Sequence, residues 1–203
     1  MNLFWLAVFF AVLAWSGWHP HDYLTWWLEV APALIALIIL WLTRKRFPLT
    51  PLSYWLILAH AIILMVGGHY TYAEVPAGDW LMDWMGGDRN NYDKLGHLAQ
   101  GFVPAVVVRE ILLRNQVVAR RGWLSLFVIS ICLAFSALYE LIEWWVALLS
   151  NQAAESFLGT QGYVWDTQSD MFLALLGASL AIVIMGKWQD RQIAALVSGA
   201  RLP

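Results

Sequence analysis

Long apolar segments constrain the fold of this chain more than any other feature of its sequence. A helix needs about 17–25 mainly apolar residues to cross the hydrocarbon core of a bilayer. Six segments are about that long: 2–18, 26–43, 51–70, 93–113, 123–149 and 167–186. The pattern predicts an all-α polytopic membrane helix bundle of about six transmembrane helices, formed by a single domain over residues 1–203.

The composition excludes other broad classes of protein. The residues are 61% hydrophobic and 13% charged, and the mean hydropathy is +0.61, far outside the range of a soluble domain. A net charge of −2, with no basic run longer than the one at 44–46, gives no surface for nucleic acid. The single cysteine, Cys132, excludes an internal disulfide and a cysteine-rich metal site. The expected partner is the lipid bilayer.

Two further stretches are interpreted from their composition and flanks. The first apolar segment lacks a basic region before it and a small-residue cleavage site after it, so it is expected to be a retained helix and not a signal peptide. The longest linker, 73–94, contains the sequence DWLMDWM, which could lie flat at the membrane surface.

Basic residues gather at one set of helix ends and so predict the orientation in the membrane. Lys and Arg favour the cytoplasmic ends of membrane helices. If both termini are cytoplasmic, ten of the twelve Lys and Arg residues lie inside, and only Arg89 and Lys94 lie outside. Twelve of the fourteen acids then lie in or beside outer loops, the exceptions being Glu110 and Asp190. We therefore expect cytoplasmic termini and an acidic outer face.

Three predicted helix ends bring polar side chains to that outer face. Spacings of three, four or seven residues place the side chains of each segment on one face of its helix. These side chains are Asp93, His97, Gln100, Glu140, Glu143, Asp166 and Asp170. Because all three ends reach the same depth, the sequence predicts one polar site built from six ionisable groups.

Each member of this predicted site could instead have a purely structural role. This alternative is weakest for the two glutamates. The aspartates that begin helices could simply act as caps. Glu140 and Glu143 instead lie near a helix C-terminus, where the dipole disfavours them, and a bare charge at depth costs roughly 2.5–3.5 kcal/mol. Arg89 and Lys94 are too few to balance the acids. Shared protons, a cationic ligand or a divalent metal must do so, and carboxylates with imidazole suit Zn²⁺ or Mn²⁺.

The third apolar segment delivers further polar groups to the outer end. Its sequence VGGHYTY carries His69, Tyr70 and Tyr72. His69 could join the metal ligands as a second imidazole, or could form an ordinary hydrogen bond at the interface. His60 lies deeper in the apolar run and is expected to be a buried, hydrogen-bonded histidine.

Small residues predict where helices approach one another closely. In the last segment they are Ala174, Gly177, Ala178 and Ala181, at spacings typical of tight membrane-helix packing. Glycines 67 and 68 are expected to do the same in the third segment. These residues indicate packing and not chemistry.

Four stretches of sequence together resemble the YjdF family of bacterial inner-membrane proteins, a domain of unknown function. They are HYTYAEVP, YDKLGHLAQGFVPA followed by RE, SALYELIEWW, and FLGTQGYVWDTQSDM. The resemblance covers nearly the whole chain and implies a multi-pass inner-membrane protein without an established activity. It also implies an acid where this chain has Tyr163. A fainter similarity, to VanZ-like proteins associated with glycopeptide resistance, rests on the Asp-Lys-x-x-His pattern of Asp93, Lys94 and His97 at the start of one helix, a Glu at the end of another and an Asp at the start of the last. It suggests a similar architecture and an envelope role.

Three classes of function fit the predicted site. The first is a metal-assisted hydrolase or transferase acting on a lipid-linked envelope substrate. Ser136, Thr160 and Thr167 are its candidate nucleophiles, none of them marked by a motif. The second is a small transporter or flippase. The position of the acids, at the outer interface and not at the midplane, argues against this class. The third is a non-catalytic protein whose polar cluster locks helices together.

Overall fold

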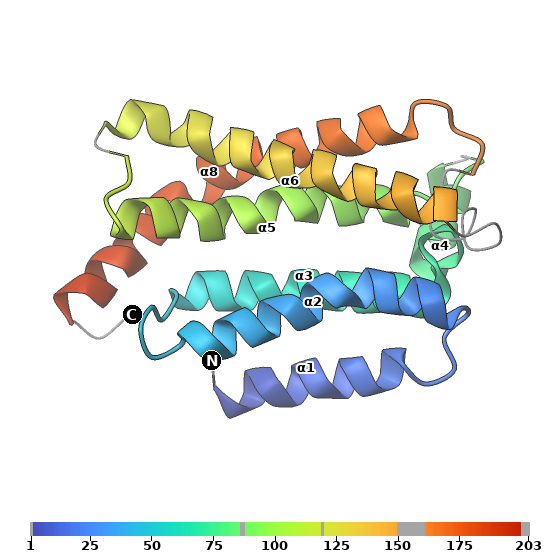
Figure 1. Ribbon diagram of the computed structural model, residues 1–203, viewed down its shortest axis with the longest axis horizontal. Coiled ribbons are helices and arrows are strands. Elements are labelled where there is room, and N and C mark those ends of the chain that lie inside the picture. The colour runs from blue at the N-terminus through green and yellow to red at the C-terminus, as the bar shows by residue number, and fades with distance from the viewer. Residues whose placement is uncertain (1, 86–87, 119, 150–160, 200–203) are drawn as a thin grey trace.

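The computed structural model describes residues 2–85, 88–118, 120–149 and 161–199. In these ranges the secondary structure is helical, and there is no strand. Five helices are long and apolar enough to cross a membrane. They are α2 (Tyr23–Thr43), α3 (Pro51–Tyr70), α5 (Tyr92–Arg114), α6 (Arg121–Leu149) and α8 (Asp166–Ser198). Figure 1 shows them running side by side along the molecule. The predicted all-α membrane bundle is confirmed.

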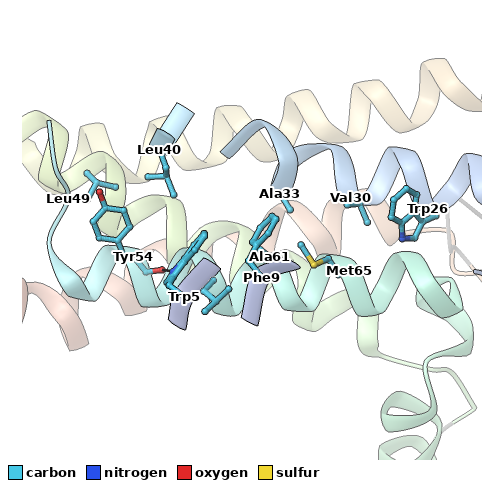
Figure 2. Packing of buried hydrophobic residues seen from close by; sticks show 11 residues of the cluster. Trp5, Phe9, Trp26, Val30, Ala33, Leu40, Leu49, Tyr54, Ala61 and Met65 are labelled. Carbon is cyan, nitrogen blue, oxygen red and sulfur yellow. Dashed lines mark hydrogen bonds between the residues drawn. The ribbon is translucent and has the colours of Figure 1, made fainter. Parts of the chain in front are cut away.

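The first apolar segment forms a shorter helix, α1 (Leu3–Ser16), which packs against α3. Its 14 residues span about 21 Å, less than the roughly 30 Å thickness of the hydrocarbon core. The Asn2 side chain caps its start by accepting a hydrogen bond from the backbone N–H of Trp5 at 2.9 Å. Trp5 and Phe9 are almost completely buried and enter an apolar core with Val30 and Met65 of α2 and α3 (Figure 2).

Two short helices lie between α3 and α5, namely the 3-10 helix η1 (Tyr72–Glu74) and α4 (Pro76–Met85). Figure 1 shows α4 at the end of the bundle where α5 and α8 begin, which is the outer end in the predicted orientation. Trp80 and Trp84 of α4 are about three-quarters exposed. An exposed tryptophan pair agrees with the expectation that this stretch lies at the membrane surface.

The contact between α5 and α8 is the closest in the bundle. A Cβ atom on Gly101 would overlap the backbone of Ala174, and one on Gly177 would overlap the backbone of Leu98. Ala174 and Ala178 are fully buried. The packing role predicted for the small residues of the last segment is therefore confirmed, and Gly101 is their counterpart on α5.

At the inner end, buried polar side chains join α3, α5 and α8. The carboxylate of Glu110 accepts hydrogen bonds from the Thr50 backbone N–H (2.9 Å), the Ser53 hydroxyl (2.7 Å) and Arg114 (2.8 Å). It thereby satisfies donors at the start of α3 that the helix itself leaves unpaired.

Helix α8 continues to Ser198, well beyond the predicted end at residue 186. The predicted segment stopped at residue 186 because polar residues follow it. Two of these polar residues are buried against neighbouring helices. Gln189 donates to the carbonyl of Val106 at 2.6 Å, and Gln192 accepts from the backbone N–H of Leu52 at 3.0 Å. Gly199, with a φ of 69°, ends the helix in the left-handed conformation. Figure 1 shows that α8 ends where α1 begins, at the inner end.

Candidate metal centre

Three of the predicted site residues meet between α5 and α8 at the outer end. Asp93 and His97 stand one turn apart on α5, and Asp170 faces them from α8. His97 Nε2 lies 3.2 Å from Asp93 Oδ1 and 4.0 Å from Asp170 Oδ2, and one ligand atom from each residue lies within 4.8 Å of the others. All three are buried. They come together because the close backbone contact at Gly101 lies one turn further along α5.

The second ring nitrogen of His97 faces a different set of partners. Nδ1 lies 3.0 Å from Gln100 Oε1 and 3.8 Å from Glu140 Oε1. An amide oxygen can only accept a hydrogen bond, so this contact suits a ring with a proton on Nδ1, either the neutral Nδ1–H tautomer or the doubly protonated imidazolium. In the neutral ring the lone pair then sits on Nε2 and points toward the two aspartates. Metal-bound histidines in proteins are oriented in this way.

Asp166 lies beside these three residues and is held by Arg89. Arg89 Nη2 is 2.5 Å from Asp166 Oδ1 and 3.6 Å from Asp93 Oδ2. Neither aspartate is a helix cap, because Asn91 precedes α5 and Trp165 precedes α8 in the cap positions. Arg89 therefore balances Asp166 and only part of the charge on Asp93.

The two α6 glutamates are buried at the same end, as predicted. Glu140 Oε1 and Asp170 Oδ1 are shielded from solvent and have no hydrogen-bond partner within the described ranges. A buried carboxylate oxygen without a partner is costly, unlike most buried polar atoms in proteins, which are paired. Glu140 Oε1 lies on the Nδ1 side of His97, and Asp170 lies on the Nε2 side with Asp93.

A cavity of about 80 Å³ continues from His97 toward the interior of the bundle. Glu143 lines it, together with Glu29 and Pro32 of α2, His60 of α3 and Tyr139 of α6. The Tyr139 hydroxyl donates to Glu29 Oε2 at 3.2 Å and so joins α6 to α2.

Glu29 and Tyr139 were not among the predicted site residues. An acid within an apolar membrane segment is itself a sign of function, and that signal would have found Glu29. Tyr139 carries no comparable signal, because tyrosine is common near membrane interfaces. His60 also differs from expectation, since its Nε2 atom is shielded and has no hydrogen-bond partner in the described part of the chain.

His69 and Tyr70 lie apart from these side chains and contact α1. His69 Nδ1 is 2.9 Å from the carbonyl oxygen of Ser16, and its ring packs on Trp15 with centroids 4.6 Å apart. Tyr72 does line the cavity, and its ring occupies the space that a side chain at Gly67 would need.

Two of the three candidate nucleophiles, Ser136 and Thr167, do not line the cavity. Ser136 is fully buried but is not among the residues that line the cavity. Thr167 is exposed, and Thr160 lies outside the described residues.

Residues 1–191 match the family model described as predicted membrane protein DUF2238. The chain belongs to this family. It is also 54% identical, over 182 residues, to the inner membrane protein YjdF of Escherichia coli K12, an alignment that covers 90% of this chain and 87% of the relative. No solved structure matches the chain. It is a multi-pass inner-membrane protein in contact with the lipid bilayer. The similarity to VanZ-like proteins finds no support in these comparisons.

The DUF2238 match includes position 163, where the resemblance implied an acid. Here Arg89 and Lys94 approach the ring of Tyr163, at 5.3 Å and 5.2 Å from its centroid. The aromatic face attracts both cations without adding a negative charge. Position 163 therefore adds no further acid to those around His97.

Proposed function

We propose that this protein is a metal-assisted hydrolase or transferase that acts on a lipid-linked envelope substrate at the outer face of the inner membrane. The supporting observation is the convergence of Asp93, His97 and Asp170, whose ligand atoms lie within 4.8 Å of one another. An unpartnered oxygen of Asp170 and one of Glu140 adjoin this group. A divalent cation held by Asp93, His97 and Asp170 would balance the two aspartates and supply the missing partner of Asp170.

The donor set fits Zn²⁺ or Mn²⁺. One imidazole nitrogen with carboxylate oxygens suits these borderline and hard cations better than a thiolate-preferring metal. Ligand atoms about 2.0–2.2 Å from one ion can be at most about 4.4 Å apart, so a small rotation of the aspartate side chains suffices. Gln100 would hold the imidazole in the ligating tautomer.

The site residues can divide the work of hydrolysis. A bound divalent cation would activate water and polarise the substrate. The water oxygen would bond to phosphorus or a carbonyl carbon while the bond to the leaving oxygen breaks. Glu143, which lines the cavity, would accept the water proton and return it to the leaving oxygen. In a transferase, an acceptor hydroxyl would replace water.

A lipid-linked substrate fits the position of the cavity within the membrane. The cavity is lined in part by α2 and α6, two helices that are long and apolar enough to cross a membrane. Leu138 and Ile142, beside the lining residues of α6, are 45% and 37% exposed. A lipid tail could remain against this apolar surface while the polar group enters the site.

Two other functions are supported by particular contacts. A transporter is favoured by Glu29 and His60, which extend the polar lining of the cavity away from the outer cluster. A purely structural role is favoured by the 3.2 Å contact between His97 and Asp93, which a doubly protonated imidazole would also make.

Metal content separates the proposed enzyme from a structural cluster. Purified protein should contain a stoichiometric divalent metal by elemental analysis, and added Zn²⁺ or Mn²⁺ should raise its thermal stability. At a hundredfold excess of free metal over Kd, binding adds about 2.7 kcal/mol to the free energy of unfolding. Binding should weaken on acidification, because the carboxylates and His97 must lose protons to ligate.

The matched variants are His97→Ala and His69→Ala, which each remove one imidazole from the outer end. His97→Ala should abolish metal binding and leave the protein inserted, whereas His69→Ala should retain the metal. Absence of metal from the wild type, with no stabilisation by Zn²⁺ or Mn²⁺, would show that the cluster is not a metal site.

A further inference from the structure

A second and larger cavity, of about 530 Å³, lies at the inner end of the bundle. It is formed by the start of α1, the connection between α2 and α3, and Leu196 near the end of α8. Arg44 and Lys45 line it, and none of its lining residues is acidic. The cavity is therefore positively charged, and it lies at the opposite end from the candidate metal centre.

The two basic side chains are free of acidic partners in the described part of the chain. Arg109 and Arg114, at the same end, are each paired with an acid at 2.7–2.8 Å. Arg44 instead donates to the backbone carbonyl of Trp41 at 3.1 Å. Its guanidinium lies 4.9 Å from the centre of the Trp41 ring. This contact uses one of five N–H donors and leaves the others for an anion.

The remaining walls of the cavity are aromatic and apolar. Trp5 is buried and donates its indole N–H to the carbonyl of Tyr54 at 2.8 Å. Trp55 is 45% exposed beside it. Pro48 and Pro51 restrict the backbone on the other side. A basic rim above an apolar, aromatic wall is the arrangement expected at a membrane interface for a molecule with an anionic head and an apolar tail.

We propose that this cavity binds the headgroup of an anionic phospholipid from the leaflet at the inner end. Arg44 and Lys45 contact the phosphate, and Trp55 and Leu196 contact the glycerol and upper acyl chains. A volume of about 530 Å³ is in the range of small-molecule sites. Basic pockets between membrane helices on the cytoplasmic side commonly bind such headgroups. This site is independent of the proposed metal chemistry.

Native mass spectrometry of the detergent-solubilised protein tests the proposal, with phosphatidylglycerol as the anionic probe and phosphatidylcholine as the zwitterionic one. Phosphatidylglycerol should give a one-to-one adduct that phosphatidylcholine does not. In R44Q/K45Q, affinity should fall about fivefold for each lost charge. The control R46Q/R120Q removes the same charge from residues that do not line the cavity and should keep the adduct.

A second variant tests the apolar wall without changing charge. Leu196→Trp should fill part of the cavity and weaken the adduct, with thermal stability confirming that the variant is folded. Equal binding of the two lipids, equal loss in both double variants, or displacement of phosphatidylglycerol by millimolar inorganic phosphate would overturn the proposal. The last result would identify a site for soluble anions.

Discussion

At the scale of single residues, Gln100 decides which nitrogen of His97 faces the aspartates. Its amide oxygen is 3.0 Å from Nδ1, and Nε2 is directed toward Asp93 and Asp170. Gln100 therefore acts as a positioning residue for the proposed metal ligand. Such partners control both the tautomer and the orientation of the ring.

Gln100→Leu should lower metal affinity about 10–100-fold, the usual effect of losing the hydrogen-bond partner of a ligating histidine. Gln100→Glu keeps an acceptor at this position and should retain most of the affinity. Metal competition titrations on the two purified variants measure the difference. Equal affinities for wild type and Gln100→Leu would show that the tautomer of His97 does not matter for binding.

The residue pattern predicted the part of this site on α5 better than the parts on α2 and α6. Helical spacing correctly placed Asp93, His97 and Gln100 on one face, because periodicity specifies which side chains of a single helix point together. It did not predict that Glu29 and Tyr139 would line the same cavity. Those contacts depend on how α2 and α6 pack against α5, which the period of any one segment does not specify.

At the scale of helices, the site depends on how closely α8 approaches α5. The long apolar segments predicted both helices, and the small residues predicted the packing face of α8. The sequence did not show that α8 continues to Ser198, because its last turns are held by single buried glutamines and not by an apolar stripe. Packing at Gly177 then sets the distance between Asp170 and His97.

Two glycines on α8 allow a matched test of that packing. A Cβ at Gly177 would overlap the backbone of Leu98, whereas one at Gly186 would come no closer than 3.9 Å to Arg109. Gly177→Ala should destabilise the protein by about 1–3 kcal/mol through overpacking and should weaken metal binding. Gly186→Ala should be neutral or stabilising by up to about 1 kcal/mol, since alanine favours helix. Thermal unfolding in detergent compares them, and equal effects would contradict the packing argument.

At the scale of the whole molecule, the arrangement of the helices determines which end carries each cavity. The acidic cluster and α4 lie at one end of the bundle, while the basic 44–46 run lies at the other. Helix α1 begins at this basic end, and helix α8 finishes there (Figure 1). Because basic residues favour the cytoplasmic side, we expect the candidate metal centre to face outward.

Reporter fusions test this orientation, using a phosphatase that is active only outside the cytoplasmic membrane. Fusions near residues 85 and 160 should be active, and those near 46, 118 and the C-terminus should be silent. A fusion near residue 20 is the most informative, because α1 has only 14 residues and could cross only with help from its flanking residues or local bilayer thinning. Activity there would show that α1 spans the membrane. An active C-terminal fusion would reverse the orientation and place the acidic cluster on the cytoplasmic side.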